Sequence, residues 1–184
     1  QIAKEKGISV TGEEIDEQIS IAREQKRLGS SEQIFEEVLR EYWDWSINDF
    51  RRSLNDELLV QKVTRALDSE TDTRAKEAYS KLQAGGDFAK IAAEYSDDEA
   101  TKNSGGEFGE VDANNRTVSQ QTVDTLFRLP EGQISEVKVI PYQSGYALEI
   151  VKNLGKGQSG VKGARILFKL KDVAATLNDR KEKQ

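Results

Sequence analysis

The 184-residue sequence contains no cysteine, no histidine and no methionine, and it has only two prolines. Without cysteine the chain has no disulfides and no thiolate chemistry, and without histidine no side chain titrates near neutral pH at its ordinary pKa. Catalysis by a serine–histidine or cysteine–histidine pair is therefore excluded, as are zinc sites built from these residues. Any chemistry must come from carboxylates, hydroxyl groups, lysine, arginine or the backbone.

The charge of the chain also excludes some partners. Lys and Arg number 27 against 33 Asp and Glu, a net charge of −6, and the only basic block is the short tail 180–184. Nucleic acid binding needs a concentrated positive face, so we expect none. No apolar run approaches the roughly 20 residues of a membrane span, and no signal peptide is present. Because the sequence opens on Gln1 in the middle of a pattern, we expect it to be a piece of a longer protein, and these absences describe only that piece.

Helical periodicity dominates the first third of the chain. Thr11 with Glu14 forms a capping-box pattern, Ser30 with Gln33 offers a second one, and Ser46 can cap a third helix. The apolar residues recur every three or four positions after each cap: Ile15, Ile19 and Ala22; then Ile34, Phe35, Val38, Leu39 and Tyr42; then Phe50, Leu54, Leu58, Val63 and Leu67. Three amphipathic helices of this kind are expected to pack on one another.

The remainder mixes helices and strands. The polar stretch 68–73 predicts a hinge, and 74–96 predicts two helices broken at Gly85–Gly86. The pattern then predicts a strand at 107–111, a helix at 117–129, strands at 133–141 and 146–154, a flexible linker at 155–160, a strand at 161–170 and a helix at 172–183. The fold class expected is α+β, with a helical module followed by a small antiparallel sheet flanked by helices.

The motifs GGDFAKIAAEYSDD, SGGEFG, FRLPEGQIS and SGYALEIVKN occur in that order. Their composition, order and spacing resemble a parvulin-type peptidyl-prolyl isomerase domain. The preceding block, from GISVTGEEIDEQI to FRRSLNDELLVQKV, is similar to the helical chaperone region of SurA- and PrsA-like foldases. The resemblance implies a chaperone-like module at 1–70, a parvulin-like domain at 71–171 and a C-terminal helix and tail at 172–184.

One part of the parvulin pattern is out of order. Parvulin domains begin with a strand ahead of their first helix, and 63–74 contains no such strand. The best match is GARILFK at 163–169. Either this strand returns to complete the sheet, as in a circular permutation, or it opens a second, truncated domain. We favour the first, because a sheet without that strand would leave a central groove of unpaired backbone groups.

The resemblance also assigns the site. Parvulins use two histidines with a cysteine or aspartate as a polar cluster. Asp98 falls at the Cys/Asp position, Arg165 at that of the first-strand histidine and Ala147 at that of the last-strand histidine. Asp98 and Arg165 are thus the candidate catalytic residues, and we expect them to form an ion pair if 163–169 joins the sheet. A turn in which Asp97 and Asp98 only bond nearby backbone amides stays the alternative.

Parvulins hold the prolyl ring in a pocket of Met, Phe and Leu side chains. Here Val118 and Thr122 fall at the Met and Phe positions, while Leu126 and Phe127 keep the pocket helix apolar. With Ala147 these four residues are the candidate substrate-binding residues. The predicted pocket is smaller and more polar than the family pattern.

The resemblance therefore implies a peptidyl-prolyl cis-trans isomerase or chaperone-type foldase with weak or lost isomerase activity. It would bind unfolded or proline-containing polypeptides outside the cytoplasm, in the periplasm or at the cell surface, anchored if at all through a segment missing from this chain. A non-catalytic polypeptide-binding chaperone, or an assembly module that dimerises through its apolar helix stripes, is the alternative. No metal and no small-molecule cofactor is expected.

Overall fold

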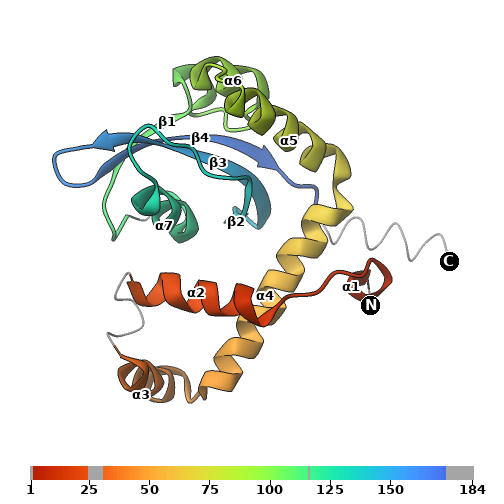
Figure 1. Ribbon diagram of the computed structural model, residues 1–184, viewed down its shortest axis with the longest axis vertical. Helices are drawn as coiled ribbons and strands as arrows, with labels where there is room; N and C mark the ends of the chain where they lie inside the picture. The colour runs from red at the N-terminus through yellow and green to blue at the C-terminus, as the bar shows by residue number, and fades with distance from the viewer. Residues whose placement is uncertain (1, 25–30, 116, 173–184) are drawn as a thin grey trace. The chain divides into compact units, whose positions relative to one another are not determined.

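The computed structural model describes residues 2–24, 31–115 and 117–172 (Figure 1). The chain divides into two compact units, Gln1–Val63 and Thr64–Gln184, which are described separately. The domain limits given by the resemblance stay predictions, and the helix expected at 172–183 lies almost wholly outside the described residues.

The first unit is helical. It holds α1 (Ile2–Glu5), α2 (Gly12–Glu24), α3 (Glu32–Trp43) and most of α4 (Ile47–Leu67). The capping box ahead of α2 is confirmed, because the Thr11 amide donates to Glu14 Oε2 at 2.8 Å and the Glu14 amide donates to Thr11 Oγ1 at 3.2 Å. The cap of α3 is Ser31 rather than the expected Ser30, which lies outside the described residues. Short side chains that bond orphan amides thus fix where these helices begin.

Most of the predicted apolar stripe residues meet in the core of this unit, but Ile34 and Tyr42 of the stripe expected on α3 are exposed. Phe35 and Leu39 are fully buried, and the rings of Phe35 and Phe50 meet edge to face with centroids 5.3 Å apart. The α2 positions of the same core are Ile15 and Ile19. The helices therefore share one core, as the periodicity predicts.

The second unit begins within α4 and continues with α5 (Ser69–Gln83), α6 (Phe88–Tyr95), a short 3₁₀ turn (Lys102–Ser104) and α7 (Gln120–Arg128). The hinge predicted at 68–73 is wrong, because α5 starts at Ser69. The carboxylate of Asp68 caps this helix by accepting from the amide of Thr71 at 3.2 Å. A polar run that reads as a loop is here the capped first turn of a helix.

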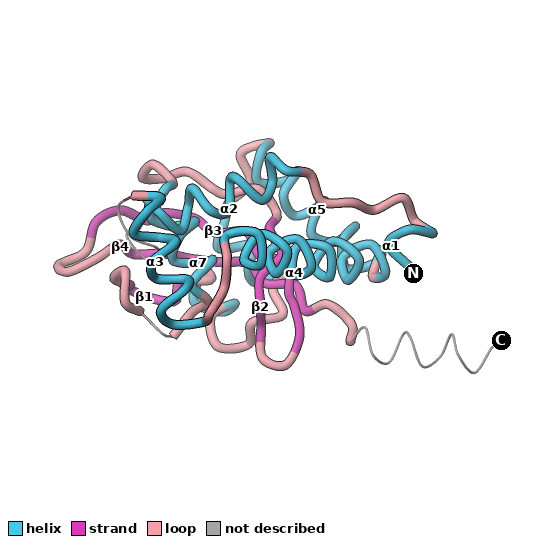
Figure 2. Tube along the Cα trace, turned by 90° about the horizontal axis from the view of Figure 1, so that it is seen from below, coloured by secondary structure: helices cyan, strands magenta, loops and turns pink. Residues whose placement is uncertain are grey.

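The sheet of the second unit has four antiparallel strands: β1 (Glu107–Val111), β2 (Lys138–Tyr142), β3 (Gly145–Lys156) and β4 (Val161–Lys169). Their spatial order is β1-β4-β3-β2, so the last strand of the sequence lies inside the sheet. The prediction that 161–170 completes this sheet is confirmed. The expected linker at 155–160 is instead a tight turn between β3 and β4, which projects beyond the end of the sheet (Figure 2).

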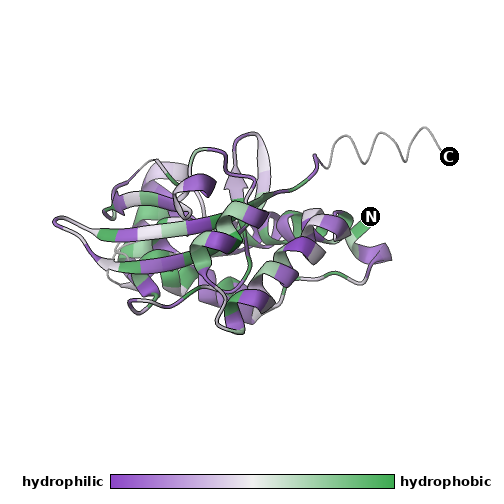
Figure 3. Cartoon of the chain, turned by 90° about the horizontal axis from the view of Figure 1, so that it is seen from above, coloured by the Kyte–Doolittle hydropathy of each residue, from purple (hydrophilic) through white to green (hydrophobic). Residues whose placement is uncertain are grey.

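Helices cover both faces of the sheet in the second unit. Helices α5 and α6 lie on one face and α7 lies on the other (Figure 1). Side chains alternate between the two faces along each strand. Because helices cover both faces, β3 and β4 carry consecutive apolar residues in their middle, with polar residues among them, and Figure 3 shows such hydrophobic and hydrophilic stretches along the strands. Leu148 and Ile150 of β3 point into the core under α5 and α6, whereas Val151 packs with Leu126 of α7. Because both faces are buried, any charged residue in the middle of these strands needs a partner.

Candidate functional site

The loop after α6 places Asp98 beside β4. Helix α6 ends at Tyr95, and the chain then runs along β4, where the Asp97 amide donates to the carbonyl of Leu167 at 2.7 Å. The amide of Leu167 in turn donates to Ser96 Oγ at 3.1 Å. One backbone–backbone bond and one bond to a serine hydroxyl therefore hold this loop against β4. The carboxylate of Asp98, the next residue of this loop, is buried.

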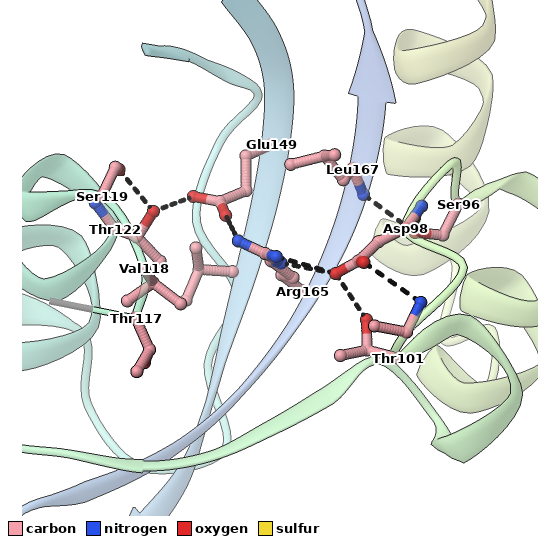
Figure 4. A network of polar contacts seen from close by, with 12 residues as sticks. Ser96, Asp98, Thr101, Thr117, Val118, Ser119, Thr122, Glu149, Arg165 and Leu167 are labelled. Carbon is pink, nitrogen blue, oxygen red and sulfur yellow. Dashed lines mark hydrogen bonds and ion pairs between the residues drawn. The ribbon is translucent and has the colours of Figure 1, made fainter. Parts of the chain in front are cut away.

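Arg165 lies in β4 and meets Asp98 (Figure 4). Its Nε donates to Asp98 Oδ2 at 2.9 Å, and its Nη2 lies 2.8 Å from the same oxygen. The hydroxyl of Thr101 donates to Asp98 Oδ2 at 2.8 Å, and the guanidinium lies over the ring of Phe108, 5.8 Å from its centroid. The ion pair expected between Asp98 and Arg165 is present.

A second carboxyl group, Glu149 of β3, completes this cluster. Its Oε2 accepts a hydrogen bond from the Thr122 hydroxyl of α7 at 2.8 Å, and its Oε1 lies 3.6 Å from Nη1 of Arg165. The Thr122 hydroxyl is itself 2.7 Å from Ser119 Oγ, the N-cap of α7. Figure 4 shows the resulting chain of contacts from the start of α7, across two strands, to the loop after α6.

The two carboxyl groups are shifted in opposite directions. Burial disfavours the charge on Asp98, but the Thr101 hydrogen bond and the charge of Arg165 outweigh it and hold the pKa of Asp98 below its usual value. Burial is the largest effect on Glu149, and it raises the pKa of that group to about 7 although Arg165 and Thr122 favour its ionised form. The negative charge of Asp98 adds to the rise. Asp98 and Arg165 thus form the charged pair, and Glu149 titrates near neutrality.

Among residues 2–24, 31–115 and 117–172, no three acidic side chains gather in a way that could hold a metal ion. In the same described part, no helix is both long enough and apolar enough to cross a membrane. The chemistry of this cluster is that of an arginine held by acidic and hydroxyl side chains.

The model of the rotamase family, described as the PPIC-type PPIase domain, matches residues 58–154, which is more than half of the chain. The chain belongs to this family. The match ends before β4, so Arg165 lies outside it, whereas Asp98, Thr122 and Glu149 lie within it.

Curated relatives carry foldase names. The chain is 34% identical over 98 residues to the foldase protein PrsA of Pediococcus pentosaceus, covering 53% of this chain and 32% of that protein. It is 29% identical over 197 residues to PrsA of Caldanaerobacter subterraneus subsp. tengcongensis, covering all of this chain and 60% of that protein. The chain therefore spans between a third and three fifths of the length of these relatives. The crystal structure of PrsA from Streptococcus pneumoniae is similar at a TM-score of 0.34 and 22% identity, over 99% of this chain and 69% of that one.

The five predicted substrate-binding residues lie in different environments in the structure. Thr122 belongs to the polar cluster, and Leu126 and the half-buried Val118 pack with Val111 and Val151. Ala147 is buried in a separate group with Ile140 and Leu167, and Phe127 is 43% exposed on α7. Thr122, Leu126 and Ala147 expose no surface in this conformation, so a ligand would reach them only after a rearrangement. Their role in substrate binding stays a prediction.

Sequence reasoning missed Glu149. It is the only charged residue in the run YALEIV, and an isolated charge in a strand that is apolar on both sides is the signal that could have identified it. The pairing of β3 with β4 was needed to place it near Arg165.

Proposed function

We propose that this chain is the part of an extracytoplasmic foldase that binds unfolded, proline-containing polypeptide segments, and that its prolyl isomerase activity is weak or lost. Membership of the PPIC-type family and the PrsA names of its relatives support the reaction class. The observation that carries the proposal is the cluster of Asp98, Arg165 and Glu149 in a domain without histidine.

Isomerisation needs no nucleophile, because the barrier of about 18–20 kcal/mol is rotation about a partial double bond. An isomerase lowers this barrier by holding the prolyl ring and by stabilising the twisted amide electrostatically. In this cluster Nε and Nη2 of Arg165 are both directed to Asp98, and the Asp98 carboxylate already accepts from Thr101. Donors and acceptors that satisfy one another contribute little to a bound peptide, so a slow enzyme is expected.

The test is a protease-coupled isomerisation assay with several Xaa-Pro peptides. We expect a rate slightly above background that Arg165→Gln removes and that Lys156→Gln leaves unchanged, since Lys156 is exposed at the end of β3. A rate at background for every peptide would mean that the isomerase activity is lost rather than weak. A rate as fast as that of a histidine-containing parvulin measured alongside would contradict it.

A purely polypeptide-binding function is the second candidate, and exposed aromatic rings favour it. Tyr42 is 71% exposed, and Trp43 and Trp45 beside it are exposed as well. Rings of this kind in the first unit offer apolar contact area for unfolded segments. This candidate predicts that the chain suppresses aggregation of an unfolded client, that Trp43→Ala weakens the suppression, and that Asp98→Ala does not. Light scattering of the chain alone would show whether the same surface instead joins two copies.

A further inference from the structure

Glu149 occupies the middle of β3 on the face that α7 covers. Its side chain keeps only 2% of its surface exposed. Its partners in the sheet register are Lys138 of β2, which is exposed, and Leu167 of β4, which is buried. An apolar residue would fill this position without the cost of burying a carboxyl group. The carboxyl group therefore needs an explanation other than packing.

The hydrogen bonding of Glu149 is incomplete. Oε2 accepts from Thr122, but none of the described residues hydrogen-bonds to Oε1, which is directed at Nη1 of Arg165 from 3.6 Å. A buried carboxyl oxygen without a partner is rare and costly. Nη1 is also the guanidinium nitrogen of Arg165 for which no contact with Asp98 is observed, whereas Nε and Nη2 both lie against Asp98 Oδ2.

We propose that Glu149 is a positioning residue that controls the Nη1 donor of Arg165, and through it the binding of the carbonyl group that precedes proline in a polypeptide. This assignment rests on the proposed function. Arg165 keeps 11% of its side chain exposed whereas Glu149 keeps 2%, so Arg165 is the more accessible of the two and Glu149 acts through it. The ligand is a tertiary amide, which offers a carbonyl acceptor but no N–H at proline.

The protonation state of Glu149 decides how strongly it holds Arg165. Burial raises its pKa to about 7, so both states are populated near neutral pH. When ionised, Glu149 attracts Nη1 and competes with the ligand carbonyl. When protonated, it leaves Arg165 with the single carboxylate of Asp98, and Nη1 can donate to the ligand.

The surrounding groups fit both states. Thr122 donates to the ionised carboxyl, and it can accept from the protonated one while donating to Ser119 Oγ, since either hydroxyl of that pair can be the donor. The charged groups that face Glu149 are Arg165 from β4 and Asp98 from the loop after α6. Lys138 of β2 is exposed beside it, and Asp124 of α7 accepts a hydrogen bond from Gln120.

The experiment measures the affinity of the chain for a proline-containing peptide by NMR titration at several pH values. In the wild type we expect the affinity to fall about fivefold between about pH 6 and about pH 8, which is the equivalent of one hydrogen bond. Glu149→Gln should keep the low-pH affinity throughout, because its amide cannot ionise. Glu136→Gln, which changes an exposed residue of the same unit, should follow the wild type.

Three results would overturn the assignment. The first is a wild-type affinity that does not change with pH. The second is a Glu149→Gln chain whose affinity changes with pH as that of the wild type does. Neither of these two results contradicts the proposed function. A chain that binds no proline peptide at any pH overturns the proposed function together with this assignment. If Glu149→Gln does not fold, the ¹³C shift of the Glu149 carboxyl in the wild type decides, since its midpoint must coincide with that of the affinity profile.

Discussion

Replacing Glu149 by glutamine should change how the stability of the second unit depends on pH, whether or not any peptide binds. Glutamine has nearly the same size and can keep the hydrogen bond with Thr122, but it cannot ionise. The variant therefore isolates the free energy that the folded chain spends on charging one buried carboxyl group.

The magnitude follows from the two pKa values of this group. A glutamate in an unfolded chain has a pKa of about 4.3, and burial raises the pKa of Glu149 to about 7 in the folded chain. The folded state thus holds this proton more tightly than the unfolded state, so the group's contribution to stability is complete below about pH 4 and is lost as the pH rises to about 7. The difference corresponds to roughly 3 kcal/mol in the free energy of unfolding at neutral pH.

The assay is chemical denaturation at a series of pH values, followed by amide signals of β3 and β4 so that only the second unit is reported. Asp98 and Asp68 have lowered pKa values, and their contributions are lost as the pH falls below about 4. They are present in both chains and cancel in the difference between variant and wild type. That difference should grow by roughly 3 kcal/mol in favour of glutamine from about pH 4 to about pH 7. A difference that stays constant, or that also appears in Glu136→Gln, would show that Glu149 does not carry the buried charge described here.

Two further substitutions test the fold. Gly106→Ala should lower the stability of the second unit by about 1–3 kcal/mol in a thermal unfolding experiment. Gly106 has φ +79°, and an added Cβ would overlap the carbonyl oxygen of Arg165. The control Gly145→Ala should lower the stability less, because nothing lies near the added Cβ. Phe35→Ala should destabilise the first unit by about 3–5 kcal/mol, because it leaves a cavity in the core. Tyr42→Ala removes an exposed ring and should change the denaturation midpoint of the first unit little. Equal effects of the two substitutions would refute the core assignment.

Local pattern was sufficient for most helices. Apolar spacing and capping residues located α2, α3 and α4, and the break at Gly85–Gly86 located the start of α6, which Asp87 caps by accepting from the Lys90 amide at 3.0 Å. The polar stretch 68–73 misled because aspartate and threonine favour both turns and helix starts, and only the bond from the Thr71 amide to Asp68 decides between them. The strand predicted at 133–141 begins five residues before the observed start of β2 at Lys138. Residues 133–137 alternate like a strand but contribute only the isolated bridge of Ile134 to Lys152.

The site could be predicted only in part. The position of Asp98 followed from the motif GGDFAKIAAEYSDD, and its partner Arg165 followed from a second motif, GARILFK, which matched at the far end of the chain; neither followed from periodicity. Glu149 could not be assigned to the site in this way, because its closeness to Arg165 depends on the register between β3 and β4 and on the helix that covers them. Thr122 was predicted to line the prolyl pocket, but its hydrogen bond to Glu149 and the contact of its hydroxyl with Ser119 depend on the same packing and could not be predicted.

The cluster also constrains the placement of β4 in the sheet. Asp98 and Glu149 are buried, and Arg165 of β4 is the cation that approaches both. Shifting β4 by one residue would turn Arg165 to the opposite face, where Leu148 and Ile150 pack under α5 and α6, and would leave two carboxyl groups without a counter-charge. Removing one partner of a buried ion pair costs about 3–5 kcal/mol, so the wrong register is strongly disfavoured. Arg165, which falls where the parvulin pattern has a histidine, is therefore also the residue that specifies where a strand from the far end of the sequence enters the sheet.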